Sequence, residues 1–98
     1  MKSISAAEFQ TVKQSEEVVL IDVREKDEYQ VGHIPGADNF PLSELGTTYK
    51  NLDKNQSYYV VCQAGGRSAR ACEFLEAQGF EVVNVTGGMN EWKGEVAK

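Results

Sequence analysis

Three short runs of mostly apolar residues, rich in β-branched and aromatic side chains, constrain the fold of this chain more than any other feature. They occupy residues 18–21, 58–61 and 80–85, and segments with helical patterning separate them. The run 18–21 is continuous, which is typical of a strand that helices cover on both faces. The alternation therefore predicts an α/β fold with a parallel sheet, to which residues 38–40 add a minimal strand.

Two of the expected helices have clear end signals. Ser5 and Glu8 form a capping box before a helix over residues 6–14. Gly79 follows the apolar stripe of a second helix and is placed to end it in a left-handed conformation. The full set of expected helices comprises residues 6–14, 25–31, 41–45, 68–78 and a last segment that contains Met89 and Trp92.

Length and composition argue against several classes of protein. The 98 residues suffice for one domain, residues 1–98, and the net charge of −5 comes without a Lys/Arg cluster that could bind nucleic acid. The apolar runs are too short to cross a bilayer, and no signal-peptide pattern follows Met1, so we expect a cytoplasmic protein with no membrane partner. Two cysteines and one histidine do not suggest a disulfide framework or a structural zinc site, so both thiols are expected to be free.

Cys62 is the leading candidate for a reactive residue because of its position. It follows the apolar run 58–61 directly, and open α/β sheets bind their ligands at the carboxyl ends of their strands. Backbone N–H groups of the following loop can converge on the sulfur and favour the thiolate, which predicts a lowered thiol pKa. An inert cysteine that ends a buried strand is the alternative.

The other residues of the loop each have an expected part in this site. Gly65 and Gly66 allow a tight loop with inward N–H groups, because residues with a Cβ tolerate the required dihedral angles poorly. Arg67 supplies a permanent cation for an oxyanion or for the charged sulfur. Ser68 is expected to cap the next helix and to offer one more hydrogen bond, and Gln63 and Ala64 are expected to line the mouth of the loop and tune substrate choice.

Four other polar or reactive residues receive supporting or structural interpretations. Asp22 and Arg24 follow the first apolar run, and we expect a supporting ion pair or hydrogen bonds that hold neighbouring loops. His33 is expected to be structural, since sulfur transfer needs no base once the thiolate has formed. Cys72 lies on a predicted apolar stripe with Ala69 and Leu75, which favours a buried, inert thiol over a resolving one.

Four segments together resemble one known family. The loop 62–68 is similar to the active-site loop of single-domain rhodanese-like proteins, the thiosulfate sulfurtransferase family. The other three segments follow the family's order through nearly the whole chain: residues 21–24, residues 32–37 with Asn39 and Pro41, and residues 85–88 with Trp92.

The resemblance implies both a fold and a reaction. The fold is a compact, mostly parallel five-stranded sheet with helices on both faces. The reaction takes sulfane sulfur from a small anionic donor such as thiosulfate, holds it as a persulfide on Cys62 and passes it to a thiol, cyanide or protein acceptor. No metal or organic cofactor is implied.

Three alternatives to a thiosulfate sulfurtransferase stay open. Cysteine-dependent phosphatases and arsenate reductases also use a loop from Cys to Arg, with five residues between them. Here only residues 63–66 intervene, and a smaller ring suits a sulfur atom better than a phosphate. A persulfide relay with little activity on thiosulfate, or a regulatory binding module, is also compatible with the sequence.

Overall fold

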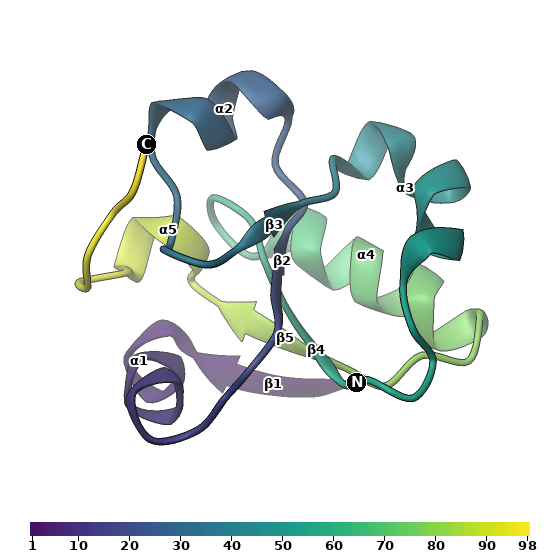
Figure 1. Ribbon diagram of the computed structural model, residues 1–98, viewed down its shortest axis with the longest axis horizontal. Helices are drawn as coiled ribbons and strands as arrows, with labels where there is room; N and C mark the ends of the chain where they lie inside the picture. The colour runs from purple at the N-terminus through teal and green to yellow at the C-terminus, as the bar shows by residue number, and fades with distance from the viewer.

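The computed structural model describes residues 1–98 and contains one five-stranded sheet in the order β1-β5-β4-β2-β3 (Figure 1). Every pair of neighbouring strands is parallel, which confirms the predicted α/β class. The strands are β1 (Lys2–Ser5), β2 (Leu20–Asp22), β3 (Asp38–Asn39), β4 (Tyr58–Val61) and β5 (Val82–Thr86).

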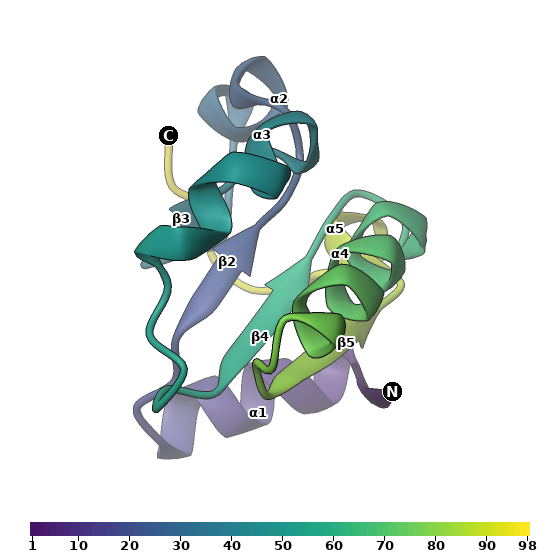
Figure 2. The same ribbon diagram turned by 90° about the vertical axis from the view of Figure 1, so that its right-hand side faces the viewer.

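Helices cover both faces of this sheet, as Figure 2 shows from the side. They are α1 (Ala6–Ser15), α2 (Lys26–Val31), α3 (Leu42–Thr48), a 3-10 turn (Tyr49–Asn51), α4 (Gly66–Ala77) and α5 (Gly88–Glu91). Side chains of α3 and α4 share one apolar cluster, and side chains of α1 and α5 share the other. None of these helices has both the length and the apolar character that a membrane span requires.

The central strands divide their side chains between the two apolar clusters. Ile21 and Val60 point to the cluster under α3 and α4, whereas their neighbours Leu20 and Val61 point to the cluster under α1. All four side chains are buried. Because both faces of these strands are covered, the sequence shows continuous apolar runs instead of alternation.

The capping box of Ser5 and Glu8 and the helix-ending glycine Gly79 are confirmed. The Ser5 hydroxyl accepts a hydrogen bond from the backbone N–H of Glu8, and the Glu8 carboxylate accepts one from the N–H of Ser5. Gly79 follows α4 with φ of +93°, the left-handed conformation expected for a glycine that ends a helix.

Several predicted boundaries were wrong, for physical reasons. The edge strand β1 was not predicted, because it has no apolar run: Lys2 and Ser3 are polar and exposed, and the other two residues are only half-buried. Helix α3 continues beyond residue 45 through Gly46, Thr47 and Thr48, which are weak helix formers, because Leu45 and Tyr49 pack on the core. The first strand begins at Leu20, two residues after its predicted start at residue 18. The last helix ends at Glu91, one residue before Trp92, which was expected to lie within it.

Candidate active site

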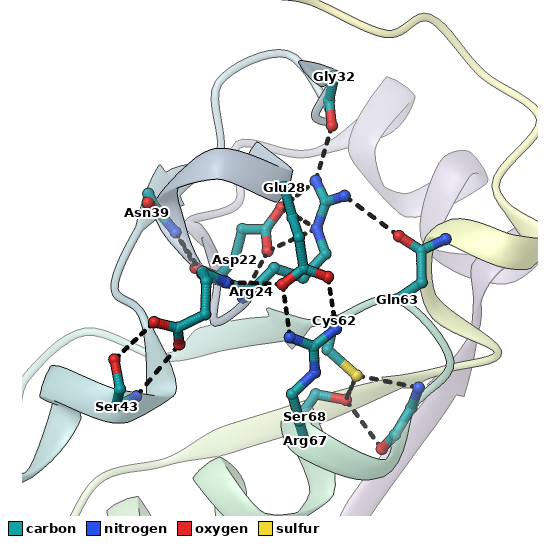
Figure 3. Close-up of polar contacts among 12 residues, drawn as sticks. Asp22, Arg24, Glu28, Gly32, Asn39, Ser43, Cys62, Gln63, Arg67 and Ser68 are labelled. Atoms are coloured by element: carbon teal, nitrogen blue, oxygen red, sulfur yellow. Dashed lines mark hydrogen bonds and ion pairs between the residues drawn. The ribbon is translucent and has the colours of Figure 1, made fainter. Parts of the chain in front are cut away.

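The candidate site lies where two adjacent strands end. Strand β4 leads directly into Cys62, and its neighbour β2 ends in Asp22, with Arg24 two residues further on. The loop from Cys62 to Gly65 then opens helix α4. Figure 3 shows these side chains near the loop that follows Cys62, together with Glu28 from α2. This is the edge of an open α/β sheet at which ligands are expected to bind.

The Cys62 sulfur is buried and is hydrogen-bonded to residues that follow it in the chain. The Gly65 N–H donates to Sγ at 3.0 Å, and the Ser68 Oγ lies 3.4 Å from Sγ (Figure 3). Burial raises the pKa of the thiol, but hydrogen bonds from the Ser68 hydroxyl and from the N–H groups of Ser68, Gly65 and Ala64 outweigh it. The resulting pKa of Cys62 lies below its usual value, so the loop favours a thiolate.

The Ser68 hydroxyl can exchange partners when the sulfur ionises. In the thiol form Cys62 donates to Ser68 Oγ, and the Ser68 hydroxyl donates to the Gly65 carbonyl at 3.0 Å. A hydroxyl proton rotates freely between acceptors. On loss of the thiol proton, the same hydroxyl can turn to the sulfur and stabilise its negative charge.

The start of α4 differs from the prediction. The helix begins at Gly66 with Gly65 as its N-cap, so Ser68 is its third residue and does not cap it. The predicted stripe is also shifted, because Ala69 is half-buried while Ser68, Ala71, Cys72 and Leu75 are buried. Hydrophobicity alone could not show that a serine would belong to the buried face.

Only one of the two loop glycines has the conformation that favours glycine. Gly65 has φ of +109°, and a Cβ there would lie 3.4 Å from the backbone nitrogen of Gly87. Gly66 does not have a positive φ, and a Cβ there would meet nothing within 4 Å. The expectation for the glycine pair therefore holds for Gly65 and is wrong for Gly66.

We expect Ser68→Ala to raise the pKa of the Cys62 thiol, because it removes the side-chain hydrogen bond that lowers this pKa. The rate of Cys62 alkylation by iodoacetamide, followed against pH by intact mass, should reach its midpoint at higher pH than in the wild-type protein. Exposed Ser43→Ala is the matched control and should leave the midpoint in place. An unchanged midpoint in Ser68→Ala would contradict the assignment of this hydroxyl.

Arg67 makes its contacts with a carboxylate and not with the sulfur. Its Nη1 and Nη2 donate to the two Glu28 carboxylate oxygens at 2.7 and 2.9 Å (Figure 3). These hydrogen bonds lower the pKa of Glu28 from its usual 4.5 to about 2. Sequence reasoning missed Glu28, since an acidic residue in the first turn of a short helix is ordinary at a positive helix end.

Asp22 and Arg24 form a buried ion pair that ties three segments together. Arg24 Nη2 donates to the Asp22 carboxylate at 2.8 Å and to the Gly32 carbonyl at 2.7 Å. Its Nη1 donates to the Gln63 side-chain oxygen at 3.2 Å. Arg24 therefore links the end of β2 to the end of α2 and to the cysteine loop.

Gln63 and Ala64 differ in their freedom to meet a substrate. The Gln63 amide is held between Arg24 and Asn90, to which it donates at 2.7 Å. Ala64 is exposed, so it is the freer of the two to contact a substrate.

Two surface cavities, of about 650 and 210 Å³, lie elsewhere, around Lys13 and Pro35, and Cys62 lines neither of them.

Backbone hydrogen bonds from α5 hold the cysteine loop in place. The N–H groups of Met89 and Asn90 donate to the carbonyls of Cys62 and Gln63, both at 2.9 Å. Gly88 has φ of +53°, and a Cβ there would lie 2.3 Å from the Cys62 carbonyl oxygen. Residues 87–88 were noted in the sequence only as part of a resemblance, and the structure shows that Gly88 permits this close approach.

Gly88→Ala is expected to displace the cysteine loop, because its methyl group would overlap the Cys62 carbonyl. We expect a loss of about 1–3 kcal/mol in the free energy of unfolding, measured with urea. Gly46→Ala is the control, since a Cβ there meets nothing and should not destabilise the protein. Wild-type stability in Gly88→Ala would show that the loop adjusts without cost.

His33 and Cys72 lie outside the group around the sulfur. The His33 ring stacks on Tyr29 at 3.8 Å, and its Nδ1 is 2.9 Å from the Tyr29 carbonyl. Cys72 is fully buried in the core, and burial, followed by the charges of Glu76 and Cys62, raises its pKa to about 12. Both cysteines are free, and no group of three or more His, Cys, Asp or Glu side chains is arranged to hold a metal ion.

Comparisons with known sequences show the family to which this chain belongs. A family model described as the rhodanese-like domain matches residues 5–95. The chain is 41% identical over 96 residues to "Putative sulfurtransferase YtwF" of Bacillus subtilis (strain 168), covering 97% of this chain and 93% of that protein. It is 33% identical over 93 residues to thiosulfate sulfurtransferase GlpE of Pseudoalteromonas translucida (strain TAC 125), covering 94% and 89% of the two chains.

A comparison with solved structures agrees. The crystal structure of SSP1007 from Staphylococcus saprophyticus matches with a TM-score of 0.95 at 35% identity, covering 100% of each chain. Both the sequence and the fold therefore match over nearly their whole length. These matches show that the chain belongs to the family of rhodanese-like domains, which includes sulfurtransferases.

Proposed function

We propose that this protein is a sulfurtransferase that carries sulfane sulfur as a persulfide on Cys62. The donor is a sulfur compound such as thiosulfate, and the acceptor is thiophilic. The observation that carries the proposal is the pair of hydrogen-bond contacts of the Cys62 sulfur. The Gly65 N–H donates to it at 3.0 Å, and Ser68 Oγ lies 3.4 Å from it; both contacts lower the pKa of this thiol. A thiolate is the form of cysteine that attacks sulfur.

The first half-reaction loads the cysteine. The Cys62 thiolate attacks the outer sulfur of thiosulfate, a new S–S bond forms, and the S–S bond of the donor breaks. Sulfite leaves with the electron pair, and the transferred sulfur stays on Cys62 as an anionic persulfide. Loop N–H groups stabilise the negative charge of that sulfur as an oxyanion hole stabilises a developing charge.

The second half-reaction removes the transferred sulfur from Cys62. A thiophilic acceptor such as cyanide attacks the terminal sulfur, the S–S bond to Cys62 breaks, and thiocyanate leaves while the thiolate is restored. A thiol or the cysteine of a partner protein can act in the same way. Neither step needs a proton from His33, whose ring lies against Tyr29.

The test is the intact mass of the wild-type protein after incubation with thiosulfate. We expect a gain of one sulfur atom that cyanide removes with release of thiocyanate. A phosphate-ester assay on the same sample should show no turnover, because the loop has only four residues between Cys62 and Arg67. A protein that hydrolyses the ester and gains no sulfur from any donor would be a phosphatase instead.

A persulfide relay is the second candidate, and one contact favours it. Arg67, the loop cation expected to hold an anionic donor, is already bound by Glu28. A relay would load readily from the persulfide of another protein and only slowly from thiosulfate. A regulatory module would gain sulfur from neither donor. Intact mass measured with thiosulfate and, separately, with a persulfide donor therefore distinguishes the thiosulfate sulfurtransferase, the relay and the regulatory module.

A further inference from the structure

The pair between Glu28 and Arg67 crosses from α2 to the start of α4 beside the cysteine loop (Figure 3). Both oxygens of the carboxylate and both terminal nitrogens of the guanidinium are used, at 2.7 and 2.9 Å. The two side chains are 33% and 34% exposed, so a small solute can reach them. This two-point geometry is the one in which a guanidinium would also bind an oxyanion.

The second guanidinium near the loop is engaged as well. Arg24 is paired with Asp22 and also donates to Gly32 and Gln63. An oxyanion that approaches Cys62 therefore meets two arginines whose charges are already balanced by carboxylates. The chain as a whole, with a net charge of −5, offers such an anion no general attraction.

This inference rests on the proposed sulfur transfer at Cys62. We propose that Glu28 is a specificity-determining residue: by occupying Arg67, its carboxylate biases the site against oxyanion donors and toward persulfides of thiols. Thiosulfate must compete with Glu28 for the guanidinium or bind beside a carboxylate. An alkyl persulfide presents the same sulfane sulfur without an oxyanion group and meets no such competition.

Loading from a persulfide uses the same nucleophile and balances without another reagent. The Cys62 thiolate attacks the outer sulfur of R–S–SH and forms an S–S bond, while the S–S bond of the donor breaks. The donor thiolate leaves with the electron pair, and the proton stays on the transferred sulfur. No oxidant or reductant is required, because the sulfur moves with its oxidation state unchanged.

Glu28→Gln is the variant that tests the proposal. Glu28 also accepts a hydrogen bond from the Glu25 N–H at 3.0 Å in the capping box of α2, and glutamine can keep this bond through its amide oxygen. Loading of Cys62 is followed by intact mass with thiosulfate and with 2-hydroxyethyl persulfide, at one ionic strength. We expect the KM for thiosulfate to fall about two- to fivefold with kcat unchanged, as for the loss of an exposed ion pair. The rate with the persulfide should stay constant.

Two further variants separate occupation of Arg67 from a general change of charge. Asp27→Asn removes one negative charge from the same helix, and Asp27 is exposed and makes no ion pair with Arg67. It should leave the preference between donors unchanged. In an Arg67→Gln background, adding Glu28→Gln should not lower the KM for thiosulfate, because the guanidinium that loss of the Glu28 charge would release is absent.

The outcomes distinguish failure of this inference from failure of the proposed function. Three results would overturn the role of Glu28 and leave sulfur transfer intact. Glu28→Gln could speed loading equally with both donors, Asp27→Asn could speed loading from thiosulfate as much as Glu28→Gln does, or Glu28→Gln could load both donors as the wild-type protein does. A wild-type protein that gains sulfur from neither donor would overturn both. A gain confined to thiosulfate and dependent on Arg67 would support the proposal.

Discussion

Cys62→Ser is expected to abolish sulfur loading, with a decrease of more than about a thousandfold in the rate of persulfide formation. Serine keeps a hydroxyl of similar size at the centre of the loop, but it does not ionise at neutral pH and cannot hold sulfane sulfur. The measurement is the intact mass after incubation with thiosulfate or with an alkyl persulfide. The variant should keep the fold, because Cys62 is followed by the same loop contacts from Met89 and Asn90.

The second cysteine provides the matched control. Cys72 is fully buried, and its pKa is raised to about 12, so Cys72→Ser should load sulfur at the wild-type rate if the protein remains folded. Cys72→Ala avoids a buried hydroxyl and serves if the serine variant is unstable. Loading that persists in Cys62→Ser and disappears in Cys72→Ala would move the active sulfur to Cys72 and refute our assignment.

Arg24→Met should cause the largest loss of stability among the substitutions considered. Asp22 is fully buried, and Arg24 donates to both of its carboxylate oxygens at 2.8–3.1 Å. Removing one partner of a buried pair leaves a charge without compensation and costs about 3–5 kcal/mol. This is a large part of the roughly 5–15 kcal/mol that stabilises a typical domain. Urea unfolding at neutral pH measures it.

A double variant tests the cause of this loss. Asp22→Asn in the Arg24→Met background removes the unpaired charge, and it should recover part of the stability lost by Arg24→Met alone. Lys26→Met, at an exposed position on α2, is the control for loss of a surface cation and should change the free energy of unfolding by less than about 0.5 kcal/mol. No recovery in the double variant would mean that Arg24 acts through Gly32 and Gln63 instead.

The sequence predicted the parts of the fold that carry a strong local pattern. Strands β2 and β4 have apolar side chains in both clusters, and this leaves continuous apolar runs that can be recognised without a structure. The run that contains β5 is interrupted only by Glu81 and Asn84. The capping box of Ser5 and Glu8 and the glycine after α4 are equally local signals. Strand β1 lacked such a signal, because Ile4 is its one apolar side chain and its pairing with β5 leaves no local pattern in the sequence.

In the candidate site, too, only the features that are local in the sequence could be predicted. The position of Cys62 after β4 could be predicted because a strand end and a glycine loop are adjacent in the sequence. The partner of Arg67 could not, because Glu28 is 39 residues away and reaches it only after α2 has folded onto the loop. The close approach of Gly88 to the Cys62 carbonyl also joins residues that are far apart in the sequence, and no periodic pattern predicts it.

The attachment of α5 to the cysteine loop determines which way the loop peptides face. All peptide bonds are trans, so the C=O and N–H of each peptide unit point in opposite directions. The Gln63 carbonyl is held by Asn90, and the N–H of the same peptide, that of Ala64, is thereby directed to the sulfur. The contribution of the Ala64 N–H to the lowered pKa of Cys62 thus depends on α5, a helix that follows the loop much later in the sequence.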